Sequence, residues 1–232
     1  MQPIAIATGS GIHLESILDS VDKEIPFRRI HGLADAELPG HRHVFIHGKC
    51  GDIPVILQCG RLHFYQGLDY AAVTRPVDIL RDAGVAKVVF VNAAGGLNPS
   101  MSCGDLLAAD RIRLCRYTGW DATPGVAFTD FLVPGCDWTG TFQWVHGPSY
   151  ETRAEIGALQ NLKSTAVGMS TGPELLRCQE LGMRGAVAAC ITNCCYKPQI
   201  LTHHEVIAVA GRASSRIAAV LRQALPEIAG EP

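Results

Sequence analysis

The chain has 232 residues, of which 47% are hydrophobic, and its formal net charge at pH 7 is −2. This length and composition suit one large domain or two small ones. The small net charge, without a block of lysine or arginine, argues against binding to nucleic acid or to a membrane surface, and apolar runs such as VAKVVFV at 85–91 are too short to span a bilayer.

The first residues, MQPIAIATGSG, contain no basic stretch before an apolar run that soon meets a Gly-Ser-Gly turn. A signal peptide is therefore not expected. Without one, the nine cysteines indicate reduced thiols rather than disulfides. We expect a cytoplasmic protein.

Short apolar runs rich in β-branched residues predict strands, and stretches with helical periodicity lie between several of them. The predicted strands are residues 4–8, 44–48, 53–59, 86–92, 165–169 and 186–192. The predicted helices are residues 71–83, 153–162, 173–182 and 203–224. Near-continuous apolar strands that alternate with helices indicate an α/β fold, with a largely parallel sheet covered on both faces.

The chain shows no internal repeat, low-complexity tract or linker, so we expect a single domain over residues 1–232. Residues 115–145, rich in Gly, Pro, Thr and aromatic residues, are expected to form a long excursion from the sheet edge. Three segments (152–155, 171–174 and 202–205) place a threonine three residues before a glutamate. This is the spacing of a capping box, which indicates three helix starts.

Small and polar residues follow five of the predicted strands. These strand ends read TGSG (8–11), GRLHFYQG (60–67), NAAGG (92–96), MST (169–171) and TN (192–193). In open α/β sheets, ligands bind beyond the carboxyl ends of the strands. Five such ends together predict one pocket.

Two of these ends suggest phosphate chemistry. TGSG before a helix start would expose backbone amides and a hydroxyl, as an anion site does, although a plain strand–turn–helix connection is the alternative. In RLHFY, Arg61, His63 and Tyr65 stand at alternate positions and would point to one side if the segment is extended. A guanidinium, an imidazole and a phenol suit a phosphate beside a sugar, whereas an exposed strand face is the alternative.

A metal site is not expected. His41, His43 and His47 lie close together, and His203 and His204 are adjacent. No set of carboxylates or cysteines completes a convincing zinc site around them.

Longer segments of the sequence resemble a known family. They are GSG (9–11), LQCGRLHFYQG (57–67), VVFVNAAGGLNPSMSCGDLLAADRIRL (88–114), GPSYETRAEI (147–156), AVGMSTGPELLRCQELGMR (166–184) and ITN (191–193). In this order they are similar to the signatures of the trimeric purine nucleoside phosphorylases, a family that includes the methylthioadenosine phosphorylases. The resemblance implies an α/β sandwich around a twisted, partly barrel-like mixed sheet. It also implies reversible phosphorolysis of purine nucleosides, with inorganic phosphate as co-substrate, no cofactor and a homotrimer.

The resemblance also implies a set of substrate-binding residues. They are Ser10, Arg61, His63, Tyr65, Ala93, Ala94, Gly95, Tyr150, Glu151, Met169, Ser170, Asn193 and His203. Among them, Ser10, Arg61, His63, Ser170 and the Ala93 amide would hold phosphate. Tyr65 and Met169 would contact the ribose, His203 would reach the 5′-hydroxyl, and Tyr150 would pack on base and sugar. Glu151 would accept the N1 proton of the purine, and Asn193 would bond N7 and the 6-oxo group. Asn193, Glu151 and His63 are the expected catalytic residues.

The side-chain amide of Asn193 bears on the choice of purine. An amide can donate to a carbonyl oxygen, whereas a carboxylate accepts from an amino group. Asparagine at this position therefore favours 6-oxopurine nucleosides such as inosine and guanosine. The resemblance also shows departures, because this chain lacks a helix before its first strand and has a shorter central segment. Phe128, in GVAFTDFLVPG (125–135), is the candidate for an aromatic residue given to a neighbouring subunit's ribose site.

Three other functions remain open on the sequence. A phosphorylase of 5′-methylthioinosine or methylthioadenosine would use nearly the same residues. A nucleosidase would use water in place of phosphate, although the phosphate-type residues argue against it. A non-catalytic purine nucleoside-binding protein would bind inosine without releasing hypoxanthine.

Overall fold

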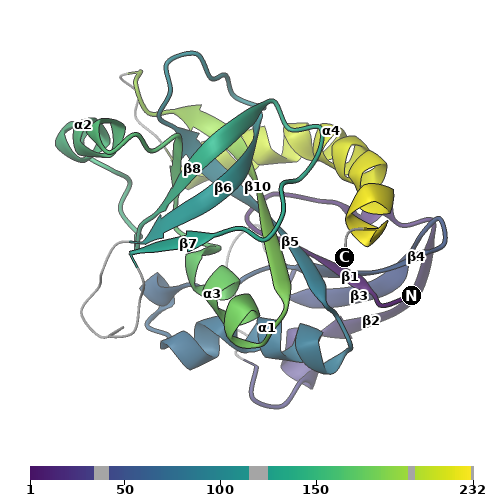
Figure 1. Ribbon diagram of the computed structural model, residues 1–232. Coiled ribbons are helices and arrows are strands. Elements are labelled where there is room, and N and C mark those ends of the chain that lie inside the picture. Colours follow the sequence, from purple (N-terminus) through teal and green to yellow (C-terminus); the bar gives the residue numbers. More distant parts are fainter. Residues whose placement is uncertain (34–41, 115–124, 198–201, 231–232) are drawn as a thin grey trace.

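The computed structural model describes residues 1–33, 42–114, 125–197 and 202–230 (Figure 1). Within these residues, ten strands join in one sheet. The strands are β1 (Ile4–Thr8), β2 (Ser20–Pro26), β3 (Val44–Cys50), β4 (Ile53–Cys59), β5 (Lys87–Gly96), β6 (Leu106–Leu114), β7 (Val126–Phe128), β8 (Trp138–Trp144), β9 (Ala166–Gly168) and β10 (Arg184–Cys194). The α-helices are α1 (Tyr70–Asp82), α2 (Arg153–Asn161), α3 (Gly172–Glu180) and α4 (His203–Gly230).

The sheet is partly closed on itself. Strand β10 pairs with both β5 and β6, so β10, β6, β8, β9 and β5 form a ring, and β1, β4, β3 and β2 continue from β5 as an open sheet. The pairs of β1 with β4 and β5, of β5 with β10, and of β8 with β6 and β9 are parallel. The other pairs are antiparallel. The expected α/β class with a mixed, partly barrel-like sheet is confirmed.

All the strands and helices predicted from the sequence form, and several are longer than predicted. Strands β5 and β10 continue to Gly96 and Cys194, and α4 runs on to Gly230. Strands β2, β6, β7 and β8 were not predicted. The excursion expected over residues 115–145 is wrong for its second half, because β8 lies inside the sheet between β6 and β9. Residues 115–124 lie outside the described residues.

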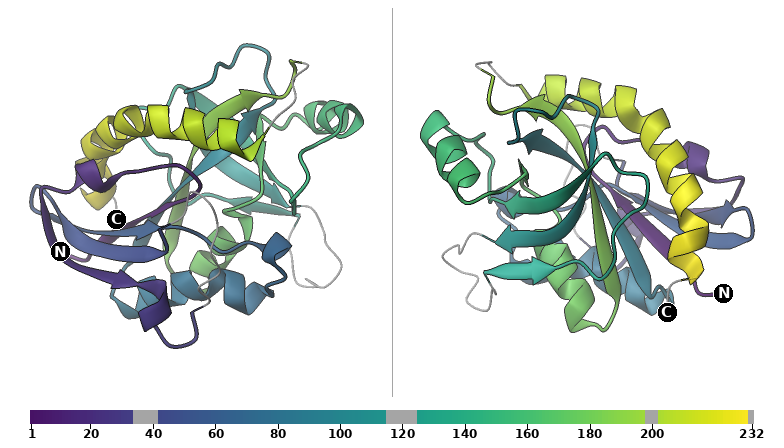
Figure 2. Two further views of the ribbon diagram at one scale, coloured as in Figure 1. Left: turned by 180° about the vertical axis from the view of Figure 1, so that it is seen from behind. Right: turned by 45° about the horizontal axis from the view of Figure 1, so that its top comes forward.

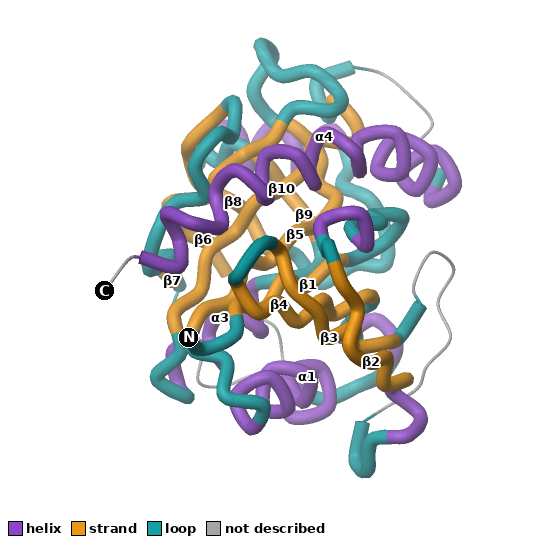
Figure 3. The backbone as a smooth tube through the Cα atoms, turned by 90° about the vertical axis from the view of Figure 1, so that its right-hand side faces the viewer, coloured by secondary structure: helices purple, strands orange, loops and turns teal. Residues whose placement is uncertain are grey.

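Helices cover the two faces of the open sheet. Successive residues of β1 point to opposite faces, so Ala5 and Ala7 belong to one buried cluster and Ile4 and Ile6 to another. Helices α1 and α3 pack on the first face and α4 on the second (Figures 2 and 3). Strands buried on both faces explain why their sequences are almost continuously apolar.

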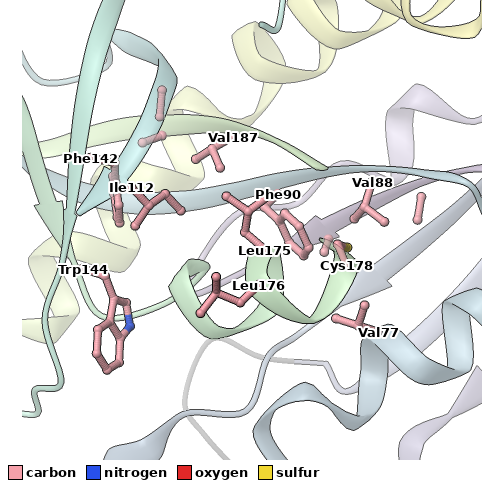
Figure 4. Close-up of a cluster of buried hydrophobic side chains, with 14 of the residues drawn as sticks. Val77, Val88, Phe90, Ile112, Phe142, Trp144, Leu175, Leu176, Cys178 and Val187 are labelled. Carbon is pink, nitrogen blue, oxygen red and sulfur yellow. The ribbon is translucent and has the colours of Figure 1, made fainter. Parts of the chain in front are cut away.

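The cluster between the sheet and α3 fixes the strand ends that surround the site. Phe90 and Val187 from neighbouring strands meet Leu175 and Cys178 of α3, and all four are at most 1% exposed (Figure 4). Full burial of one such apolar side chain contributes about 1.5–3 kcal/mol. Several of them together fix the position of α3 against β5 and β10.

The three predicted capping boxes all form. At α2, the Thr152 amide donates to the Glu155 carboxylate over 2.7 Å, and the Glu155 amide donates back to the Thr152 hydroxyl. Residues 171–174 and 202–205 make the corresponding bonds at α3 and α4. Over the described residues, no helix has the length and apolar character needed to cross a membrane.

Candidate active site

The ends of β1, β4, β5, β9 and β10 open onto one cavity. It is lined by Gly9, Ser10, His63, Tyr65, Asn92, Ala93, Ala94, Gly95, Tyr150, Glu151, Val167, Gly168, Met169, Ser170, Thr192, Asn193, His203 and Val206. This set includes twelve of the thirteen predicted substrate-binding residues, from segments up to 193 residues apart in the chain (Ser10 to His203). The exception is Arg61.

Parallel pairing of β5 with β10 builds one wall of the cavity. The register places Asn193 opposite Gly95, with a β-bulge between Ile191 and Asn193. A bulge redirects a side chain at a strand end. The hydroxyl of Thr192, at the bulge, lies 3.2 Å from the Ala94 carbonyl oxygen and 3.3 Å from Oδ1 of Asn193. The predicted backbone segment 93–95 and the Asn193 amide are thereby brought side by side.

The end of β9 builds a second wall. Met169 and Ser170 follow the strand, and the indole of Trp144 donates to the Met169 carbonyl over 3.2 Å. Gly147 makes room for Met169, because a Cβ atom at residue 147 would lie 2.3 Å from the methionine sulfur. The φ of Gly147, +74°, also lies in the left-handed region that favours glycine.

The RLHFY segment does not present all three predicted side chains to one side. The chain turns into a short 3₁₀ helix, Phe64–Gln66, instead of staying extended. His63 and Tyr65 line the cavity with their rings stacked at 4.7 Å between centroids. Burial, with a smaller contribution from the charge of Arg61, lowers the pKa of His63 to about 3, so its imidazole is neutral. Burial raises the pKa of Tyr65 to about 12, which keeps the phenol protonated.

Arg61 lies behind the cavity wall and not in it. Its side chain is 0% exposed, and its guanidinium donates to the Thr171 hydroxyl and to the Ala7 carbonyl oxygen. The carboxylate of Glu174, at the start of α3, lies 3.6 Å away. Arg61 is therefore the one predicted phosphate residue that the structure places outside the cavity lining, and its direct contact with phosphate stays a prediction.

Tyr150 and Glu151 stand at the joint before α2, as the sequence indicated. The cap at Thr152 fixes the start of the helix, and these two residues precede it at the cavity rim. Tyr150 is 38% exposed. Burial raises the pKa of the Glu151 carboxyl above its ordinary 4.5. His203, the first residue of α4, also lines the cavity.

Six lining residues were not named individually from the sequence. They are Gly9, Asn92, Val167, Gly168, Thr192 and Val206. All except Val206 lie in or beside a predicted strand end, so the strand-end pattern itself was the signal. Val206 belongs to the first turn of α4 and carries no chemical signature that sets it apart from a core residue.

Residues 1–33, 42–114, 125–197 and 202–230 contain no cluster of three or more His, Cys, Asp or Glu side chains that could hold a metal ion. His41, from the histidine group considered above, lies outside the described residues. His43 is buried against Phe27, with ring centroids 5.3 Å apart, and His203 lines the cavity described here.

The sequence of the chain is similar to those of known enzymes. A sequence model of the phosphorylase superfamily matches residues 3–133 and 138–226. The purine nucleoside phosphorylase of Bos taurus is 30% identical over 92% of this chain and 84% of its own length. Purine nucleoside phosphorylase 1 of Bacillus subtilis is 30% identical over 89% of this chain and 84% of its own length.

Solved structures show the same fold. The purine nucleoside phosphorylase of Schistosoma mansoni in complex with inosine aligns with a TM-score of 0.83 over 99% of this chain and 90% of that chain, at 24% identity. A Schistosoma enzyme in complex with hypoxanthine aligns with a TM-score of 0.80 at 23% identity. At these identities the likeness concerns the fold.

Proposed function

This chain belongs to the phosphorylase superfamily, and we propose that it is a purine nucleoside phosphorylase that cleaves inosine and guanosine with inorganic phosphate. The products are the free purine base and ribose 1-phosphate. The observation that carries the proposal is that the residues expected to bind phosphate, ribose and purine line one cavity. Named relatives over most of the chain's length support the same activity.

The phosphate end of the site is assigned to Ser10, Ser170 and the backbone at Ala93. Hydroxyls and amides at strand ends supply hydrogen bonds without charge. His63 is neutral and can donate one N–H, but it brings no positive charge. Arg61 is fully buried beside this end, since a Cβ atom at Gly9 would lie 3.9 Å from its Cδ, and it would act on phosphate through the field of its guanidinium.

The sugar and base follow in order from that end. Tyr65, Met169 and His203 are assigned to the ribose, with His203 nearest the 5′-hydroxyl. Tyr150 would stack on the base. Glu151 and Asn193 would read its N1–H edge and its N7 and 6-oxo edge.

The chemistry follows from the charge that develops in the reaction. Cleavage of the N-glycosidic bond builds positive charge on the sugar and negative charge on the departing purine, and an enzyme accelerates it by binding that distribution more tightly than the substrate. Phosphate fixed beneath the anomeric carbon serves as nucleophile and countercharge, and such positioning supplies about 7–11 kcal/mol in favourable cases. The Asn193 amide stabilises the leaving base. The reaction as proposed uses phosphate as co-substrate and needs no organic cofactor or metal.

A nucleoside panel tests the proposal. Inosine, guanosine, adenosine, 5′-methylthioinosine and 5′-methylthioadenosine are incubated with and without phosphate, and the products are identified by chromatography. We expect hypoxanthine and guanine, each with ribose 1-phosphate, and only when phosphate is present. Release of base without phosphate would indicate a nucleosidase, and faster cleavage of a methylthio nucleoside would overturn the assigned substrate. Binding of inosine without any product would indicate a nucleoside-binding protein.

The raised pKa of Glu151 predicts an unusual acid limb in the pH profile. The ionised carboxylate accepts the N1 proton of the purine, and its population falls as the pH drops through the raised pKa. The kcat/KM for inosine should therefore begin to fall at a higher pH than an ordinary carboxyl, near 4.5, would give. Phosphate also titrates in the acid range, so the control is Glu151→Gln. An acid limb unchanged in Glu151→Gln would remove Glu151 from this role.

We also infer that the protein works in the cytoplasm and that it forms a homotrimer. Support for contacts between subunits comes from Phe128, which is 60% exposed on β7 with the guanidinium of Arg111 over its ring at 5.3 Å. Val126, two residues earlier on the same strand, is also exposed, as is Leu132. An aromatic and aliphatic patch of this kind suits a contact between subunits. The mass in solution, measured by light scattering, decides the number of subunits.

A further inference from the structure

The amide of Asn193 is held at both ends by neighbouring side chains. The hydroxyl of Thr192 lies 3.3 Å from Oδ1, and Nδ2 donates to the sulfur of Cys195 over 3.6 Å. The Thr192 hydroxyl has one proton and lies at almost the same distance, 3.2 Å, from the Ala94 carbonyl oxygen. Because that proton is shared between two acceptors, the Nδ2 end contributes much of the restraint on the amide.

Cys195 is itself fixed in place from the strand side. Its backbone amide donates to the Gly96 carbonyl oxygen over 2.9 Å. Its sulfur fills the space that a side chain at Gly95 would need, since a Cβ atom there would lie 2.5 Å from it. The thiol is thus wedged between the end of β5 and Asn193. It is absent from the lining of the cavity described above, but it lines an adjoining cavity together with Tyr150, Glu151 and Asn193. The hydrogen bond from Nδ2 is the contact through which Cys195 can act on the Asn193 amide.

The thiol stays protonated at this place. Burial, followed by the nearby charge of Glu151, raises the pKa of Cys195 to about 12. A neutral thiol is a weak acceptor that takes one N–H of the amide and leaves the other unused. Oδ1 likewise keeps one lone pair beyond the contact with Thr192.

We propose that Cys195 is a positioning residue for catalysis, which holds the Asn193 amide so that its second N–H and its second lone pair face the leaving purine together. This inference rests on the proposed function. A 6-oxopurine that takes a proton from water at N7 as it departs becomes a neutral base, with a carbonyl acceptor at position 6 beside an N–H donor at N7. The restrained amide matches both groups, and an amide free to turn would match them for only part of the time.

The test compares inosine with 7-methylinosine in Cys195→Ala. The methylated base carries its positive charge before the bond breaks, so its departure does not depend on a hydrogen bond at N7. We expect kcat for inosine to fall about threefold to tenfold, as loss of one weak hydrogen bond predicts, with KM for phosphate unchanged. Turnover of 7-methylinosine should change less than twofold. Cys195→Ser, which keeps a small donor and acceptor, should recover most of the inosine activity.

Two controls separate positioning from general damage. Cys136→Ala makes the same change at another partly buried thiol, which packs against the cluster beneath α4, and it should leave both substrates unaffected. Melting temperatures show whether each variant is folded. An equal fall for both nucleosides in Cys195→Ala, or no fall for either, would overturn the positioning role while leaving the proposed function intact. Failure of the unmodified protein to cleave inosine would instead overturn the proposed function, and this inference with it.

Discussion

Replacement of Asn193 by alanine should lower kcat for inosine by about 100-fold to 1,000-fold. This magnitude follows from the loss of one preorganised hydrogen-bonding group aimed at charge that develops in the transition state. Asn193 is 8% exposed, lies at the bulged end of β10 and is held from both sides, so its amide is already oriented before substrate binds. The measurement is the steady-state rate of hypoxanthine release at saturating phosphate.

The form of the loss distinguishes two roles for the amide. A group that acts mainly on the leaving base lowers kcat, whereas a group that binds substrate and transition state equally raises KM at constant kcat. Asn161→Ala, at the exposed last residue of α2, is the matched control and should retain full activity. A loss of less than tenfold in Asn193→Ala, or a change confined to KM, would contradict the role given to the amide.

Much of the fold could be predicted because the central strands are buried on both faces. Ile4–Thr8 and Ile53–Cys59 are apolar runs with sharp ends, and the structure keeps their predicted bounds. Strand β2 could not be found in this way, because its sequence SVDKEIP is charged and its residues are mostly exposed. Strand β8, WTGTFQW, has a glycine and two threonines that read as a loop. Its place inside the sheet depends on pairing with β6 and β9, which are distant partners in the chain.

The candidate site was more predictable than the strands around it. In open α/β sheets, ligands bind beyond the carboxyl ends of the parallel strands. The residues after 8, 92 and 192 could therefore be assigned to one cavity from the sequence alone. Arg61 shows the limit of this reasoning. Alternation along RLHFY groups Arg61 with His63 and Tyr65, but Arg61 is fully buried and absent from the cavity lining, whereas the other two line the cavity. The partner that draws the guanidinium inward, Glu174, lies more than 100 residues away in the chain.

The buried pair of Arg61 and Glu174 predicts a large loss of stability when one partner is removed. Both side chains are at most 2% exposed, with Nη1 and Oε2 3.6 Å apart, and the guanidinium also lies 5.4 Å from the centre of the Phe90 ring (the ring is shown in Figure 4). Glu174→Ala leaves the guanidinium buried without its carboxylate. Removal of one member of such a pair costs about 3–5 kcal/mol. Chemical denaturation, as the free energy of unfolding, measures the loss.

The capping boxes supply the matched control for this prediction. Glu155 closes the box of α2 on the surface, as Glu174 closes the box of α3 in the interior. Alanine at 155 removes the bonds that the Glu155 carboxylate accepts from Thr152 and keeps the bond from the Glu155 backbone amide, so its cost should be far smaller than that at 174. The difference between Glu174→Ala and Glu155→Ala therefore isolates the unpaired charge from the lost cap. Equal losses in the two variants would show that the guanidinium finds another countercharge or reaches water, and Arg61 could then no longer be regarded as a fixed cation beneath the phosphate end of the site.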